Sequence, residues 1–194
     1  DMDDVNSFNL IDFSGSDFSG SVLAPINGNN NFSDANFSGA VHFGDDYSGN
    51  IYSNATFDGA TLHGDFRNAT MTNATFTSTN FVGYITIANS NMQGATFRDI
   101  RGDSGQLSIY YSFLENVTIE DSREMEISII GHRDEPTNMH EAKLINANIV
   151  FPEFGIFDGI VSSDLVENDC CLKEPWVIED GVLLNTLEGV ENPA

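Results

Sequence analysis

A large apolar side chain recurs every five residues through much of this chain of 194 residues. The series begins with Phe8, Phe13, Phe18 and Leu23 and resumes after slips of register. A period of five fits neither the roughly 3.6 residues per turn of an α-helix nor the two-residue alternation of a flat strand. A fixed short period is typical of a solenoid, in which each coil stacks on the one before it.

A mostly small residue stands two positions before each large one. A chain that turns a corner every five residues would place both on the same inward side, and its backbone would pair between coils about 4.8 Å apart. The predicted inward ladder consists of Phe8, Phe13, Phe18, Phe32, Phe37, Phe57, Leu62, Phe76, Phe81 and Phe97. The predicted small inward residues, which let the corners close, are Ala35, Ala55, Ala60, Ala74 and Ala95.

The clearest units read Ala-Asn-Phe-Ser-Gly at 35–39, Ala-Thr-Phe-Asp-Gly at 55–59 and Ala-Thr-Phe-Thr-Ser at 74–78. They resemble the pentapeptide-repeat family, whose units read approximately Ala-(Asp/Asn)-(Leu/Phe)-x-x. The resemblance is strong over residues 6–99 and resumes weakly at Leu114, Ile119 and 142–151. It implies an all-β fold, a right-handed quadrilateral parallel β-helix with four units per coil.

Departures from the repeat suggest how the chain is divided. We expect a β-helix over residues 1–159, irregular at 100–108 and 120–141, and a non-repeat C-terminal capping or docking segment over 160–194. Residues 100–108 are rich in Gly and Asp, which favour turns, so they predict a protruding loop. At about twenty residues per coil, the repeats predict roughly seven coils and a rod about 35 Å long.

The charge of the chain is strongly negative. Thirty acidic side chains against seven basic ones give a net charge of -23, and residues 1–66 contain no Lys or Arg. Such a surface repels nucleic acid and anionic membranes, so we expect no direct nucleic-acid binding. No apolar run is long enough to predict a membrane span. An acid-rich, lysine-poor surface is typical of halophilic proteins, and simple solubility of a rod is the alternative explanation.

No motif for catalysis stands out. The sequence lacks a Gly-x-Ser-x-Gly elbow, a His-Glu-x-x-His pair and a phosphate-binding loop, so we expect no enzyme, no catalytic residue and no dedicated metal site. His42 and His63 are about one coil apart and could share a metal, but a buried His42 in place of a core aromatic is the simpler interpretation. Asp1–Asp4 and Asp45–Asp46 could bind Ca²⁺ weakly, and no other cofactor is expected.

Both cysteines, Cys170 and Cys171, lie in the non-repeat segment. Because they are adjacent, a disulfide between them would require a strained ring, and pairing with another chain would be easier. Such an intermolecular disulfide would indicate an oxidising exterior. Two reduced, partly buried thiols are the alternative.

Two functions are compatible with these features. The first is a non-catalytic structural or interaction protein, extracellular or at the cell surface, acting in adhesion or in head-to-tail self-assembly with itself as partner. The start at Asp1 without a methionine predicts a processed, exported product. The second is cytoplasmic and follows from the resemblance: some pentapeptide-repeat proteins mimic DNA and act on DNA gyrase, a type II topoisomerase. Duplex DNA carries one charge per roughly 1.7 Å of axis, close to the charge density expected for this rod.

Overall fold

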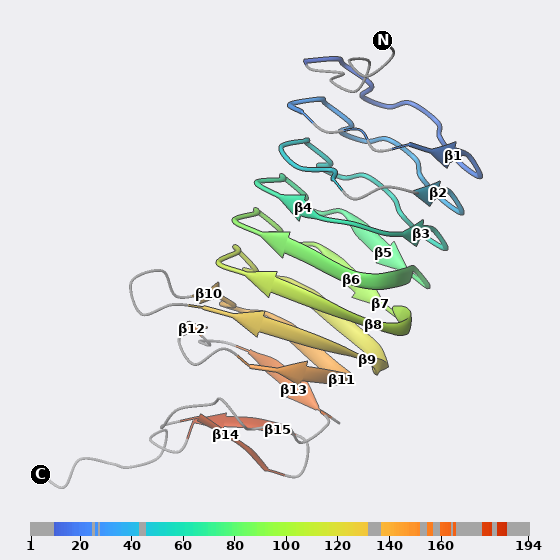
Figure 1. Cartoon of the computed structure of the whole chain (residues 1–194). Helices are drawn as coiled ribbons and strands as arrows, with labels where there is room; N and C mark the ends of the chain where they lie inside the picture. Colours follow the sequence, from blue (N-terminus) through green and yellow to red (C-terminus); the bar gives the residue numbers. More distant parts are fainter. Residues whose placement is uncertain are drawn as a thin grey trace, which may run out of the picture.

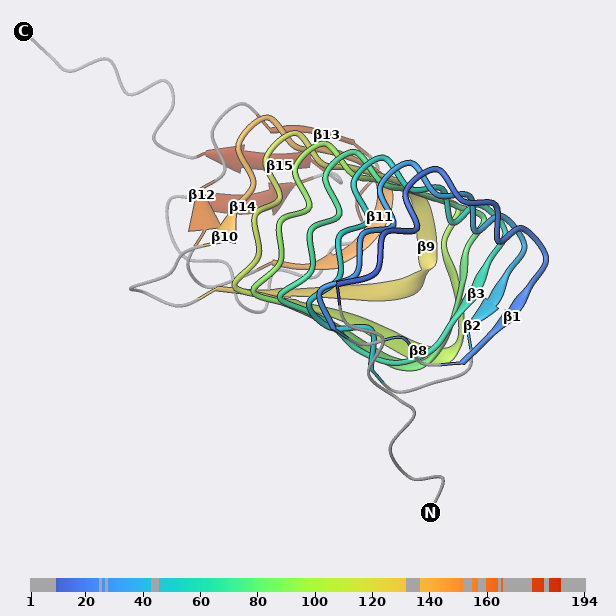
Figure 2. The same cartoon turned by 90° about the horizontal axis from the view of Figure 1, so that it is seen from above.

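A computed structural model describes residues 10–24, 26, 28–42, 46–131, 137–151, 155–156, 160–163, 165, 176–179 and 182–185. Phe8, Asp45, Cys170, Cys171 and the acidic residues at 1–4 lie outside the described residues. The described part is a stack of coils that descends along one axis (Figure 1). Seen from above, the coils overlie one another with a progressive offset (Figure 2).

Each coil contributes four bridging segments, and these align in four parallel ladders. Face one carries the bridges that join Asp12, Asn31, Ile51, Thr70, Asn91, Phe113 and Asn138. Face two runs through Asp17, Asn36, Thr56, Thr75, Thr96, Thr118 and Lys143. Face three runs through Val22, Val41, Thr61, Asn80 and Arg101. Face four contains the pair Asp46 and Asp65 and the pairs of Ile87 with Phe66 and Ile109. This arrangement confirms the predicted all-β, four-sided parallel β-helix.

The strands lengthen down the rod. The upper coils hold β1 (Val22–Leu23), β2 (Val41–His42), β3 (Thr61–Leu62), β4 (Phe66–Arg67), β5 (Thr75–Thr77) and β7 (Thr96–Arg98). The longer strands are β6 (Asn80–Ala88), β8 (Arg101–Tyr110), β9 (Thr118–Ile130) and β11 (Lys143–Val150). Beyond them, β10 (Thr137–Asn138) pairs with β12 (Gly155–Ile156), and β13 (Val161–Ser163) pairs with β11. The last two strands, β14 (Trp176–Glu179) and β15 (Val182–Asn185), form an antiparallel hairpin.

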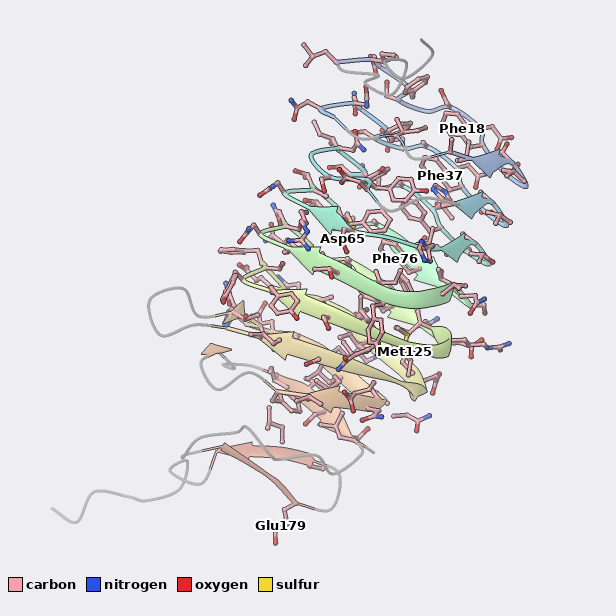
Figure 3. The ribbon with its side chains drawn as sticks, in the orientation of Figure 1. Phe18, Phe37, Asp65, Phe76, Met125 and Glu179 are labelled. Carbon is pink, nitrogen blue, oxygen red and sulfur yellow. The ribbon has the colours of Figure 1, made fainter. Side chains whose placement is uncertain are left out.

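The interior is built from columns of stacked aromatic rings. On face two, Phe37 stacks on Phe57 and Phe57 on Phe76 with centroids 4.9 Å apart and nearly parallel planes. Figure 3 shows Phe18, Phe37 and Phe76 one below another inside the coils. The spacing matches the distance between paired strands, because each ring belongs to one coil of the ladder. The core is therefore continuous along the rod.

The protruding loop predicted at 100–108 was wrong, because this segment belongs to β8. Gly102 pairs with Phe81 in the ladder, and a Cβ at Gly102 would lie 3.3 Å from the Phe81 carbonyl oxygen and 3.4 Å from Met125 Sδ. The glycine therefore makes room for Met125 from the next coil. The extra residues are absorbed by a register shift in the β6–β8 pairing between Val82 and Tyr84.

Candidate functional site

The predicted inward ladder lies inside the coils, so most of its members do not face a ligand. The buried members are Phe32, Phe37, Phe57, Leu62, Phe76, Phe81 and Phe97. The small residues Ala35, Ala55, Ala60, Ala74 and Ala95 are also buried. Phe13 and Phe18 in the first described coil are only partly buried. Any binding function of these coils must use outward side chains or the exposed edge of a coil.

His42 and His63 do not face each other. His42 is buried on β2, in ring contact with Phe37 and Tyr47, and its ladder neighbour above is Leu23. Neither ring nitrogen has a hydrogen-bond partner within the part of the chain that the structure describes. Burial lowers the pKa of His42 from 6.5 to about 4, so the ring stays neutral near pH 7. Among the described residues, no group of three His, Cys, Asp or Glu side chains could hold a metal ion.

Arg67, Arg98, Arg101 and Lys143, the Lys and Arg residues whose side chains the structure describes, are each held in an ion pair. Arg67 pairs with Asp65 at 2.8 Å, and Arg101 pairs with Asp99 at 2.8 Å. Glu120 binds both Arg98 and Lys143. Each of these arginines and the lysine thus has its charge offset by a neighbour, while the sequence up to residue 66 has no Lys or Arg at all.

Carboxylates on the upper coils are fixed in their ionised form. Asp12 Oδ1 accepts hydrogen bonds from Ser14 N and from Asn31 Nδ2 in the next coil. Asp17 makes the same contacts with Ser19 and Asn36. The backbone hydrogen bonds, followed by the other contacts, lower the pKa of both carboxyls. The upper coils therefore present a negatively charged surface, which attracts cations and basic groups and repels anions at low ionic strength.

The upper edge of the first described coil is open within the described part of the chain, and this edge is called the open edge below. Asn31 N donates to Ile11 O and Asn36 N donates to Ser16 O, so the second coil uses its outward N–H groups to pair with the first. The corresponding N–H groups of Asp12 and Asp17 donate to no residue that the structure describes. Val22 beside them is 71% exposed. Unpaired strand edges of this kind are templates for pairing with another chain.

The opposite end of the rod is covered. The hairpin of β14 and β15 lies below β13 (Figure 1), and Leu183 N donates to Ser162 Oγ at 3.0 Å. Leu183 is buried as part of the core cluster. This contact restricts access to the lower edge at β13. The described part of the chain contains no helix that could cross a membrane.

Comparisons with known proteins assign no function to this chain. No family model matches the sequence, and no curated protein matches it. A trypsin-treated form of QnrB1, a plasmid-mediated fluoroquinolone resistance protein, is 16% identical, with 82% of this chain and 90% of that chain covered and a TM-score of 0.40. HetL, a pentapeptide-repeat protein involved in heterocyst differentiation regulation in the cyanobacterium Nostoc, is 14% identical, with 84% and 87% covered and a TM-score of 0.23.

Proposed function

We propose that this pentapeptide-repeat β-helix is a non-catalytic interaction rod that associates with a second copy of itself through its first coil. The observation that carries the proposal is the open edge at Asp12 and Asp17, whose outward N–H groups have no partner among the described residues. Partly exposed Phe13 and Phe18 lie directly behind this edge. Pairing with a second edge would satisfy the N–H groups and bury the two rings.

The two ends of the rod differ, which favours contact between like ends. Head-to-tail stacking would require the β13 edge, where the β15 backbone already bonds to Ser162. We therefore favour an isologous dimer, in which the same coil of each copy meets its equivalent, over an open filament. In this proposal the segment over 160–194 is a cap.

A non-catalytic role fits the arrangement of the polar side chains. The inward positions hold apolar groups or buried amides such as Asn30 and Asn50, which bond to each other. The outward carboxylates are tied to neighbouring amides, as Asp34 is to Asn54. Covalent catalysis uses a nucleophile beside a base, and our proposal assigns no such pair to this chain.

The proposal includes export to a salty exterior. Two facing coils that carry Asp12 and Asp17 and no cation would repel each other at low ionic strength. At about 1 M salt the Debye length is roughly 3 Å, so the repulsion is screened while apolar burial remains. Self-association should therefore strengthen as salt rises.

Light scattering coupled to size-exclusion chromatography tests the proposal. At about 2 M NaCl we expect a dimer mass, falling toward the monomer at about 0.05 M. Asp12→Pro and Asp17→Pro remove the edge donors, so both should shift the equilibrium to monomer. They also remove the carboxylates that accept hydrogen bonds within the monomer, so Asp12→Ala and Asp17→Ala, which lose the same side-chain contacts and keep the N–H groups, are the matched comparison and should stay dimeric. Asp34→Asn, which removes a charge one coil further down, is the control and should stay dimeric. A monomer at all salt concentrations and at high protein concentration would refute the proposal.

A second candidate function is DNA mimicry toward a DNA-binding enzyme such as gyrase. The observation that favours it is that every Lys and Arg side chain that the structure describes is held in an ion pair, which leaves the excess negative charge without an unpaired cation among those side chains. A partner that binds DNA would recognise such a rod through its basic groove. This interaction would weaken as salt rises, opposite to self-association. Inhibition of gyrase supercoiling at micromolar protein would support it, and no inhibition would exclude it.

A further inference from the structure

A hollow of about 410 Å³ opens on face one, between the coils that contain Asn91 and Phe113. Its volume lies inside the range of roughly 300–1,000 Å³ that is usual for ligand pockets. The residues that line it are Asn89, Ser90, Asn91, Gln93, Tyr111 and Phe113. None of them belongs to the predicted inward ladder or to the open edge.

Phe113 is an aromatic residue at an outward ladder position, where only the backbone takes part in the pairing between coils. Its side chain points outward and is 53% exposed. Its ladder neighbours on face one are Asn91 above and Asn138 below, both polar. Because so much of the ring stays exposed, its burial contributes little to the free energy of folding. The ring adds apolar surface to the hollow and not to the core.

Tyr111 stands at a corner where three other coils hold Gly or Asn. Two residues before the face-one bridge, Gly49, Asn68 and Asn89 adopt left-handed backbone with φ of 77°, 53° and 50°. Gly and Asn tolerate this conformation, whereas for other residues it costs about 1–2 kcal/mol. Tyr111 adopts it with φ of 48° and keeps its side chain 41% exposed. Among the described residues, the other hydrophobic side chain at positive φ is Leu10, which occupies the same corner in the first described coil.

The amides around the hollow are not engaged in the usual pairing between coils. On face one and at its corners, Asn31 donates to Asp12, Asn73 donates to Asn54, and Asn138 donates to Glu115. Within the described residues, the side chains of Asn89 and Gln93 have no hydrogen-bond partner, and Asn91 uses only Oδ1, which accepts from Gln93 N. Three side-chain amides thus keep free donors beside two exposed aromatic rings.

Charge restricts what could bind. No Lys, Arg, Asp or Glu lines the hollow, although the chain as a whole carries a net charge of -23. An anionic ligand would be repelled by the surrounding field and would find no cation to bind. A cationic ligand would find no carboxylate in the lining. The lining therefore suits an uncharged ligand that has both apolar faces and many hydroxyl groups.

We propose that this hollow is a binding site for neutral saccharides. The C–H faces of a pyranose ring pack on aromatic rings, whose faces carry partial negative charge, and Tyr111 and Phe113 supply two such rings. Side-chain amides offer a donor and an acceptor together, which matches adjacent sugar hydroxyls, and Asn89, Asn91 and Gln93 supply them. The proposal does not depend on self-association, because the hollow lies at the coils of Asn91 and Phe113, well below the first coil on the same face.

The sharpest test replaces the two aromatic residues with the residues that other coils hold at the same positions. Tyr111→Asn places at this corner the residue that stands there as Asn68 and Asn89, and Phe113→Thr places on face one the residue that stands there as Thr70. Both variants should fold, and Tyr111→Asn should be as stable as the parent chain or more stable. Tyr84→Asn removes a tyrosine that is 77% exposed and does not line the hollow, so it is the matched control.

The full chain is screened on a glycan array and titrated calorimetrically with cellohexaose, xylohexaose, mannohexaose and laminarihexaose, with hexagalacturonate as the acidic comparison. We expect at least one neutral hexaose to bind with Kd of about 0.01–1 mM, little affected by salt. Tyr111→Asn and Phe113→Thr should each weaken binding at least about tenfold, and Tyr84→Asn should not.

Three results would overturn the proposal. The first is the absence of any neutral-glycan binding to the parent chain. The second is binding that both hollow variants retain. The third is that the parent chain binds no glycan while Tyr111→Asn loses binding to a protein partner, because the hollow would then be a protein interface. Dimerisation measured on the same samples separates failure here from failure of the self-association proposal.

Discussion

The ring of Phe57 lies between those of Phe37 and Phe76, with centroids 4.9 Å away on both sides and planes within 4° of parallel. Phe57→Ala would remove a fully buried ring from the middle of this column and leave a cavity that the rigid ladder cannot close. We expect a loss of about 3–5 kcal/mol in the free energy of unfolding. Urea titration followed by circular dichroism measures it. Thr56→Ala, on the outward side of the same unit, is the control and should cost less than about 1 kcal/mol.

His42 makes stability depend on pH at the residue scale. Its pKa is 6.5 in the unfolded chain and about 4 when buried, so the unfolded state binds the proton more tightly. The stability that the neutral ring contributes is complete above pH 6.5 and is lost as pH falls toward 4, by up to about 3 kcal/mol. Urea midpoints at pH 7 and pH 4.5 should differ accordingly.

His42→Leu is the variant that isolates this effect. Leucine already stands in this column as Leu23, which pairs with His42, so the substitution should fit the ladder. We expect the loss in the free energy of unfolding between pH 6.5 and pH 4 to be smaller in this variant. If the two proteins lose stability equally over that range, His42 is not the titrating group.

At the scale of elements, Glu120 connects three strands. It lies on β9 with a side chain only 10% exposed and accepts hydrogen bonds from Arg98 on β7 and Lys143 on β11. The contact with Lys143, followed by that with Arg98, lowers the pKa of Glu120. Glu120→Gln would leave two cations facing each other across a neutral amide, and we expect a loss of about 1–3 kcal/mol in the free energy of unfolding at pH 7.

The pair of Arg101 and Asp99 provides the comparison. Both side chains are more exposed, at 63% and 40%, so Asp99→Asn should cost less than about 1 kcal/mol. Denaturant titrations of the two variants in parallel would show the difference. Equal costs would mean that the three-strand bridge contributes no more than an ordinary surface pair.

The five-residue period was sufficient to predict the β-helix and which residues turn inward, because one coil is a repeated local unit. It was not sufficient to predict β6, β8 and β9, where Ile85 and Ile87 or Leu107 and Ile109 alternate with a period of two. Gly102 was predicted to lie in a loop. Its place in β8 depends on Met125 from another coil, which fills the space beside the glycine, and no single unit contains this information. Tyr111 was missed for a similar reason: only comparison with Asn68 and Asn89 shows that other coils hold asparagine at its corner.

At the scale of the whole molecule, shape and charge are distributed unequally along the rod. The upper coils have an open edge and no cation, whereas the lower coils hold the ion pairs and end at a hairpin. In a solenoid each coil contacts only its neighbours, so these features act locally and their effects add along the rod. The edge, the hollow on face one and the lower cap can therefore be altered separately.

The net charge of -23 predicts how the folded rod responds to salt. Salt screens the repulsion between the uncompensated carboxylates, which stabilises the rod. Salt also weakens the described ion pairs, which destabilises it. Surface pairs contribute about 0–1 kcal/mol each, and the carboxylates greatly outnumber them, so screening of repulsion should win.

We expect the melting temperature to rise by several degrees between about 0.05 and 1 M NaCl. The combined variant Asp12→Asn, Asp17→Asn and Asp34→Asn removes three charges from the cation-free coils, so its melting temperature should be higher at low salt and should rise less. Thermal melts at low protein concentration, where the chain is monomeric, separate this effect from self-association. A melting temperature that falls with salt would show that the ion pairs of Arg67, Arg98, Arg101 and Lys143, and not the repulsion, dominate the electrostatics of the rod.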